Sequence, residues 1–147
     1  MFKALPKSRV PRQIALLNRI SSGPAAVNLP TKVSSIALSF KFQNSNGHMG
    51  ARRFWQLYLP QVQFNNPQVP ISINRFWANN REEHANIPAT LTITFADGSS
   101  KAIPVQHKHS DEILKEFIEA AGATPIPIEQ QVIIKKSDES DKYTAAR

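Results

Sequence analysis

Two glycines followed by two arginines form the segment of this sequence with the clearest capacity for binding chemistry. The segment reads NGHMGARR over residues 46–53 and continues into helix-compatible residues. Glycine permits a tight turn, and the first turn of a helix offers free N–H groups and the positive end of the helix dipole. We therefore expect a phosphate-binding helix start at residues 50–53, with His48 beside it. The alternative is that the glycines only permit a turn and that Arg52 and Arg53 are solvated.

Basic residues are distributed unevenly along the 147 residues, whose formal net charge is +7. Residues 1–81 contain eleven Lys and Arg and no Asp or Glu, whereas residues 82–147 contain seven basic and eleven acidic residues. Chance clustering is one explanation, but so long a carboxylate-free stretch favours contact with nucleic acid or anionic lipid. Arginine binds phosphate bidentately, which favours RNA or DNA over a membrane surface. The predicted phosphate contacts are Lys3, Lys7, Arg9, Arg12, Arg19, Lys41, His48, Arg52, Arg53 and Arg75.

Residue types with catalytic or metal-binding potential do not form a recognisable site. The chain has no cysteine, which excludes thiol redox chemistry and the zinc sites that contain cysteine. Of the four histidines only His107 and His109 are close in sequence, and Lys108 between them opposes a bound cation. No NTPase phosphate loop, dinucleotide-binding glycine pattern or nucleophile elbow is present. We therefore predict no enzymatic activity, cofactor, metal or small-molecule substrate, and no apolar stretch is long enough for a transmembrane segment.

The first half of the chain is expected to hold a basic arm, a strand and a helix. Residues 1–32 contain four prolines and one apolar-basic stretch, which predicts an arm with a short helix over residues 13–20. Strict alternation of apolar residues predicts a half-buried strand over residues 33–42. After a polar loop, residues 51–59 favour a helix that Pro60 is expected to interrupt.

Further alternation predicts two more strands. Apolar residues at every second position indicate a strand over residues 69–73, in which Pro70 fits only at the beginning or on an edge. Residues 79–88 are polar and are expected to form a loop. Threonines alternate with apolar residues over residues 90–95, which predicts the third strand.

The next elements are expected to be a hairpin and a helix. An Asp-Gly pair ending at Gly98 is a strong hairpin signal, and an odd-length loop centred there would place Ile93 opposite Ile103. Ser110 is a suitable helix N-cap, acidic residues follow it, and an apolar stripe runs to Gly122. This is the best-marked helix in the chain.

The predicted order is thus β-α-β followed by β-β-α, which is the core of the thioredoxin-like α/β (α+β) fold. We expect a basic N-terminal arm over residues 1–32, a thioredoxin-like domain without redox cysteines over residues 33–122, and a C-terminal extension with a charged tail over residues 123–147. The tail is expected to carry little structure unless a neighbour orders it.

One stretch of the sequence resembles a known family. Residues 46–67 read NGHMGARRFWQLYLPQVQFNNP and resemble the hallmark of the ribosomal protein and NADH dehydrogenase domain family. That hallmark is a helix beginning Gly-Ala-Arg and an aromatic residue, here residues 50–54. A Pro-x-hydrophobic-Gln-aromatic-x-Asn-Pro segment follows, here residues 60–67. The resemblance extends over about residues 12–135.

The resemblance implies a thioredoxin-like fold in a family of mitochondrial ribosomal proteins of both subunits and an accessory subunit of respiratory complex I. The lead-in NGHMGAR and residues 16–20 are most similar to the fungal mitochondrial large-subunit members. We therefore expect a structural constituent of the large ribosomal subunit in the mitochondrial matrix, which binds ribosomal RNA and other mitochondrial ribosomal proteins. A small-subunit ribosomal protein and a complex I accessory subunit are the alternatives. The basic arm is also compatible with an uncleaved import signal.

Overall fold

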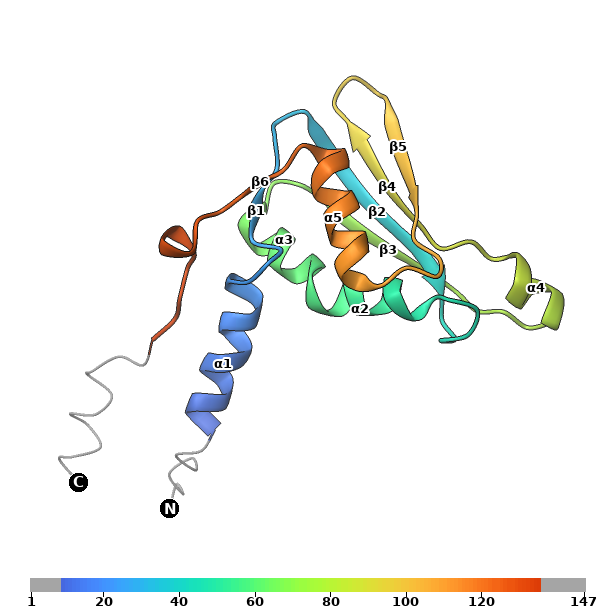
Figure 1. The fold of residues 1–147 in the computed structure, drawn as a ribbon, viewed down its shortest axis with the longest axis horizontal. Coiled ribbons are helices and arrows are strands. Elements are labelled where there is room, and N and C mark those ends of the chain that lie inside the picture. The colour runs from blue at the N-terminus through green and yellow to red at the C-terminus, as the bar shows by residue number, and fades with distance from the viewer. Residues whose placement is uncertain (1–8, 136–147) are drawn as a thin grey trace, which may run out of the picture.

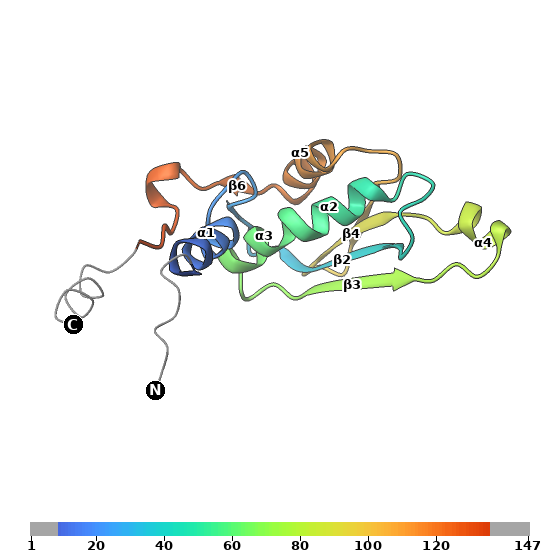
Figure 2. The ribbon, with the colours of Figure 1, turned by 90° about the horizontal axis from the view of Figure 1, so that it is seen from below.

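Helices cover one face of a mixed β-sheet in the computed structural model of this chain, which describes residues 9–135 (Figures 1 and 2). Lys3, Lys7 and the charged tail beyond residue 135 lie outside the described residues. In chain order the elements are α1 (Arg9–Ser21), β1 (Val27–Asn28), β2 (Val33–Lys41), α2 (Met49–Leu57), α3 (Leu59–Asn65), β3 (Ile71–Phe76), α4 (Arg81–Asn86), β4 (Thr90–Phe95), β5 (Ser100–Pro104), α5 (Ser110–Ala121), β6 (Thr124–Pro125) and the 3-10 turn η1 (Ile128–Gln130).

The main sheet has the strand order β3-β2-β4-β5. Strand β2 is parallel to β3 and antiparallel to β4, and β4 and β5 form an antiparallel hairpin. Ile36 of β2 lies between Ile71 of β3 and Ile93 of β4, so the alternation in each strand produces one apolar face. The predicted strands and their β-α-β, β-β-α order are present, and Pro70 precedes the edge strand β3 as expected.

The apolar face carries the core, and the other face is open. Phe54 of α2 and Phe117 of α5 are both buried, and their ring centroids are 6.1 Å apart. On the opposite face one row runs across all four strands through Ser72, Ala37, Thr92 and Ala102, whose side chains are exposed or half-buried. Helices α2, α3 and α5 lie on one side of the sheet, while α4 lies beyond its end (Figure 2).

The helix is interrupted near Pro60 as predicted, because α2 ends at Leu57 and a second helix, α3, begins at Leu59. Pro60 lies in the first turn of α3, where no N–H donor is required of it. One prediction was wrong. Helix α4 lies within the segment predicted as a loop. Its signals were Asn80 immediately before the helix and two acidic residues in the first turn.

The predicted hairpin register was wrong by two residues. Ile93 lies opposite Lys101 rather than Ile103, because the loop is centred on Asp97 and not on Gly98. The Asp97 carboxylate accepts hydrogen bonds from the Ser99 N–H at 2.9 Å and the Ser99 hydroxyl at 2.5 Å, which fixes this turn. A shift of two residues keeps the same side chains on the apolar face.

Helix α5 begins and ends close to its predicted positions. The N-cap is His109, whose Nδ1 accepts a hydrogen bond from the Asp111 N–H at 3.3 Å, and not Ser110, which is buried in the first turn. Gly122 is the predicted C-cap, with a φ of 67° in the left-handed region that glycine adopts without strain.

The N-terminal arm is not separate from the domain. Ala25, Val27 and Leu29 are buried in the core, and β1 pairs with β6 of the C-terminal extension. The predicted boundary between residues 32 and 33 therefore does not separate a free arm from a core. Residues 25–32 complete the packing of the domain, and residues 124–134 pack onto them and onto α1 (Figure 1).

Two buried amides hold the arm in place. The Oδ1 of Asn66 accepts a hydrogen bond from the Leu29 N–H at 2.8 Å, and its Nδ2 donates to the Val27 carbonyl at 2.7 Å. Gln61 accepts a hydrogen bond from the Ala25 N–H at 3.0 Å. Both amides come from the segment over residues 60–67. This segment therefore anchors the N-terminal arm to the domain, a role that could not be inferred from its residue pattern alone.

Replacing Asn66 by Ala is expected to lower the free energy of unfolding by about 3 kcal/mol, because buried backbone groups would lose their partners. The neighbouring Asn65→Ala is the matched control. The Asn65 side chain makes one hydrogen bond, to the Gln61 carbonyl, and its loss should cost about 1 kcal/mol. Urea unfolding of the two variants checks the difference, and equal losses would contradict this role for Asn66.

Candidate nucleic-acid interface

Helix α1 presents the largest group of exposed arginines that were predicted to contact phosphate. Arg9, Arg12 and Arg19 are exposed, and the helix contains no acidic residue. Within residues 9–135 none of their guanidinium groups forms a hydrogen bond or an ion pair with the protein. Their donors therefore remain available to an external acceptor.

Gly47, in the loop before α2, and Gly50, in the first turn of α2, serve close packing. A Cβ at Gly50 would lie 1.7 Å from the Lys108 carbonyl oxygen, and one at Gly47 would lie 2.3 Å from the His107 ring. The Gly47 carbonyl also accepts a hydrogen bond from the His107 N–H at 3.0 Å. The segment before α5 thus covers the start of α2. The glycines are required for this close packing, which neither sequence-based alternative had considered, and the covered helix start weakens the expected phosphate site.

The two arginines at this helix start have different surroundings. Arg52 is half-buried and donates to the Asn44 side chain at 2.9 Å. Arg53 is exposed and lines a hollow of about 410 Å³ together with His107 and residues 108–110. Lys108 in this hollow is paired with the Glu116 carboxylate at 2.8 Å. Arg53 is therefore the better placed of the two for an external anion.

Lys41 and His48 lie inside the protein, each only 1% exposed. The Lys41 ammonium donates to the Ser45 hydroxyl at 2.9 Å and to the His84 carbonyl at 3.2 Å. The His48 Nδ1 accepts a hydrogen bond from the Lys41 N–H at 2.9 Å. Their prediction as RNA contacts is corrected, because neither side chain reaches the surface and both organise the loop between β2 and α2.

The environment of His48 favours its neutral form. Burial lowers the pKa of His48 below its ordinary value of 6.5, and the nearby Lys41 cation lowers this pKa further. Because Nδ1 accepts a hydrogen bond, we place the proton on Nε2, which faces the Ile87 carbonyl without reaching hydrogen-bond geometry.

Arg75 is half-buried against aromatic rings. Its guanidinium carbon lies 3.9 Å from the centroid of the Phe42 ring and 5.0 Å from that of Trp55. Its Nη2 is 3.5 Å from the Phe42 carbonyl, and its buried Nε has no partner in the part of the chain that the structure describes. Arg75 therefore stabilises the end of β3, and only its outer edge can meet a ligand.

Neither a metal site nor a membrane span is found in the described residues. No group of three His, Asp or Glu side chains lies close enough together there to hold a metal ion. No helix among residues 9–135 has the length and apolar character needed to cross a membrane.

Gly50→Ala is expected to destabilise the fold by more than about 2 kcal/mol, because the new methyl group would meet a backbone carbonyl that cannot move aside freely. Gly98→Ala is the control. It has a positive φ but open space around it, so it should cost about 1 kcal/mol. Thermal or urea unfolding measures both, and a Gly50→Ala protein of normal stability would remove the packing role.

The stability of the fold is expected to fall as the pH drops below about 6.5. The folded-state pKa of His48 lies below its ordinary value, so below about pH 6.5 protons bind the unfolded state in preference to the folded state. Above about pH 6.5, His48 is neutral in both states and does not contribute to the pH dependence of stability. His48→Asn keeps an acceptor near Nδ1 and removes the titration, so its stability should decline less between pH 6.5 and 5. His109→Asn retains a capping oxygen, and this control should decline as the wild type does. A His48→Asn profile that matches the wild type would contradict this assignment.

Comparison with known proteins identifies the family of the chain. A family model described as the mitochondrial ribosomal protein L51/S25/CI-B8 domain matches residues 51–110. The large ribosomal subunit protein mL61 of Saccharomyces cerevisiae is 35% identical over 130 residues, which cover 86% of this chain and 93% of that protein. The protein of the same name from Neurospora crassa is 34% identical over 139 residues, covering 76% of this chain and 66% of that protein.

A third relative, from Schizosaccharomyces pombe, is 24% identical over 102 residues and carries the same name. These relatives are all fungal and are named as large-subunit proteins rather than as enzymes. They confirm the predicted resemblance to the large-subunit members, and they agree with the prediction of a non-enzymatic protein. The chain belongs to the mitochondrial ribosomal protein L51/S25/CI-B8 domain family, and within it to the fungal large ribosomal subunit protein mL61 group.

Proposed function

We propose that this chain is a structural constituent of the large subunit of the mitochondrial ribosome in the matrix, where it binds ribosomal RNA phosphates and neighbouring ribosomal proteins. The observation that carries the RNA contact is the set of exposed arginines on α1, which have no hydrogen-bond or ion-pair partner among residues 9–135. The likeness to the mL61 proteins supports the particle and the subunit.

The arginines of α1 suit a phosphate backbone because their guanidinium groups are donors without an acceptor in the part of the chain that the structure describes. An Arg guanidinium offers a planar fork that matches phosphate oxygens bidentately. Such contacts position a protein on RNA without reading its sequence, so specificity comes from RNA shape and from adjacent proteins. Arg53 adds a further exposed cation, and the outer edge of Arg75 another. Lys3, Lys7 and Arg52 remain in the proposal as secondary candidates.

Helix α1 also carries apolar side chains that its own chain leaves exposed. These are Val10, Leu16, Leu17 and Ile20. Leu16 and Ile20 line a groove of about 640 Å³ with Leu57 and Tyr58. Apolar surface of this kind suits a protein neighbour rather than a phosphate backbone. Arg19 lines the same groove. The helix is therefore proposed to meet ribosomal RNA through its arginines and a ribosomal protein through the apolar side chains that lie beside them.

The domain is proposed to be a thioredoxin-like fold that serves only as a scaffold. The support is the strand order β3-β2-β4-β5, in which β3 is parallel to β2, β4 is antiparallel to β2, and β5 is antiparallel to β4. Without cysteine, this scaffold has no thiolate for redox chemistry.

Charge reversal of both Arg12 and Arg19 to Glu is expected to weaken RNA binding and incorporation into the large subunit. The double variant Lys101→Glu, Lys115→Glu is the matched control, because it makes the same change in net charge at exposed residues of β5 and α5. Two lost phosphate contacts should reduce the salt-dependence slope of RNA affinity by roughly 1.4 to 1.8.

Sedimentation of mitochondrial lysates through sucrose gradients at low and high salt measures incorporation. The wild-type and control proteins are expected to sediment with the large subunit and to be released by RNase treatment. Equal incorporation of the two double variants would remove α1 from the RNA contact. Sedimentation with the small subunit, or with respiratory complex I, would overturn the proposed particle.

A further inference from the structure

We propose that an exposed aromatic cluster at the end of β3, formed by Phe42 and Trp77, binds an unpaired base of RNA by stacking. This inference rests on the proposed function, because it requires that the chain meet RNA. It adds a second type of contact, which recognises single-stranded RNA rather than phosphate charge.

Both rings are exposed far more than a folding core requires. Trp77 is 61% exposed and Phe42 is 45% exposed. The ring centroids of Phe42 and Trp77 are 5.2 Å apart, with 50° between their planes, so one ring supports the other while an outer surface remains free. Large aromatic side chains grouped in this way mark an interaction surface.

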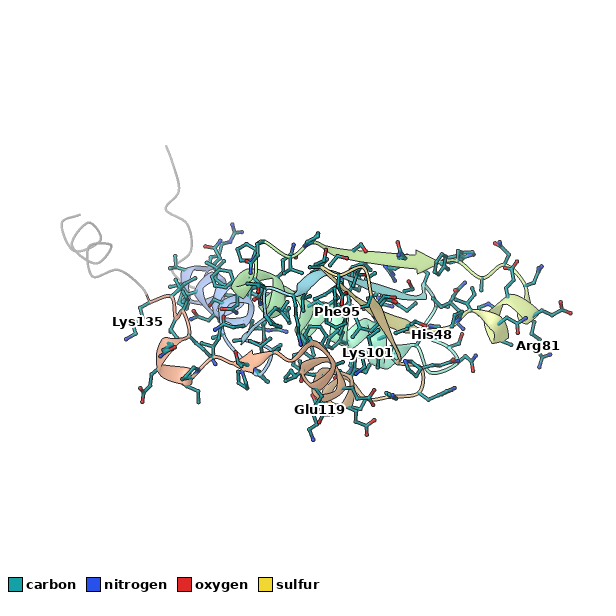
Figure 3. All side chains as sticks on the ribbon, turned by 90° about the horizontal axis from the view of Figure 1, so that it is seen from above. His48, Arg81, Phe95, Lys101, Glu119 and Lys135 are labelled. Atoms are coloured by element: carbon teal, nitrogen blue, oxygen red, sulfur yellow. The ribbon has the colours of Figure 1, made fainter. Side chains whose placement is uncertain are left out.

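The position of the cluster separates it from the arginines of α1. Strand β3 points toward α4, and α4 and α1 lie at opposite ends of the long axis of the molecule (Figures 1 and 2). Arg81, the first residue of α4, marks this end in Figure 3. A contact at each end would fix the orientation of the protein on RNA, which one contact cannot do.

The backbone that carries the rings is held firmly. The Phe42 N–H donates to the Phe76 carbonyl at 2.8 Å. The Gln43 side chain donates to the Ala78 carbonyl at 3.0 Å and accepts from the Ala78 N–H at 3.4 Å. The backbone on both sides of Trp77 is thus hydrogen-bonded. A backbone held in this way loses little conformational freedom when a base stacks on the Trp77 ring.

Arg75 gives the cluster a cationic support. Its guanidinium carbon lies 3.9 Å from the centroid of the Phe42 ring, which holds a positive charge directly beside the aromatic surface. A neighbouring cation favours an RNA ligand, because each unpaired base arrives with its own phosphate. It gives no comparable advantage to an apolar side chain of a protein.

The adjoining cavity has polar groups at its rim. It measures about 550 Å³, within the usual size range of ligand sites, and its lining includes Phe76, Trp77, Asn79, Glu82 and Asn86. Amide and carboxylate groups can bind the donors and acceptors on a base edge, whereas a purely apolar partner would leave them unsatisfied. The carboxylates disfavour phosphate inside the cavity, so the base is the part of the nucleotide that enters.

Tryptophan fluorescence tests the proposal directly, since the chain has only two tryptophans, Trp55 and Trp77. Trp55→Phe leaves Trp77 as the sole emitter, and Trp77→Phe is the matched control that leaves Trp55. Single-stranded oligo(A) should quench the emission of the Trp55→Phe protein, while an RNA duplex of equal length should quench it much less. Emission from the Trp77→Phe protein should change little.

Affinity measurements on the full chain complete the test. Trp77→Ala is expected to weaken binding of the single strand roughly tenfold, with an unchanged salt slope and unchanged duplex binding. Trp77→Phe, which keeps an aromatic ring, should retain most of the affinity.

Equal single-strand affinity of the wild-type and Trp77→Ala proteins, or absence of quenching, would overturn the stacking site while leaving the phosphate contact intact. Failure of the wild-type protein to bind any RNA would overturn both proposals. Unchanged RNA binding together with loss of a ribosomal protein from affinity-purified Trp77→Ala particles would assign the cluster to a protein partner instead.

Discussion

The burial of residues 25–29 beneath α3 is the constraint on which the rest of the structure depends. Asn66 satisfies the backbone of this segment from inside the core, where water cannot replace it. Because the segment is fixed, α1 leaves the domain in a set direction and its arginines have a defined position. Two uncharged amides, those of Asn66 and Gln61, therefore determine where the basic residues of α1 lie.

The helices and strands with a regular apolar pattern could be predicted from the sequence, because residues that contact the core recur at the period of the element. The alternation around Ile36 and the stripe of α5 predicted the sheet, its apolar face and the helix. Lys41 and His48 could not be placed, since a residue type does not reveal burial when its partner comes from residue 84. The hairpin register depended on the hydrogen bond between Asp97 and Ser99. Loops centred on residue 97 and on residue 98 keep the same side chains on the apolar face, so the alternation could not distinguish them.

The sequence predicted which segment carries the basic charge of the candidate interface, but not which side chains lie together on its surface. Counting charges identified the arginines of α1, while the aromatic cluster around Trp77 was missed because strand alternation accounts equally well for aromatic residues in a core. The glycines before α2 show the converse error. Their pattern is shared by phosphate sites and by close packing, and only the position of the Lys108 carbonyl distinguishes the two.

The contact between α1 and the C-terminal extension has a consequence for the order in which the chain can fold. The Asn18 side chain donates to the Ile134 carbonyl at 3.0 Å and accepts from its N–H at 2.7 Å, across 116 positions of sequence. During synthesis the first helix therefore waits for almost the last described residues before its final partner exists. Long-range closure of this kind slows folding. Until those residues are synthesised, α1 can pack on α3 alone, so the seal between the two ends of the described chain is the last part of the structure to form.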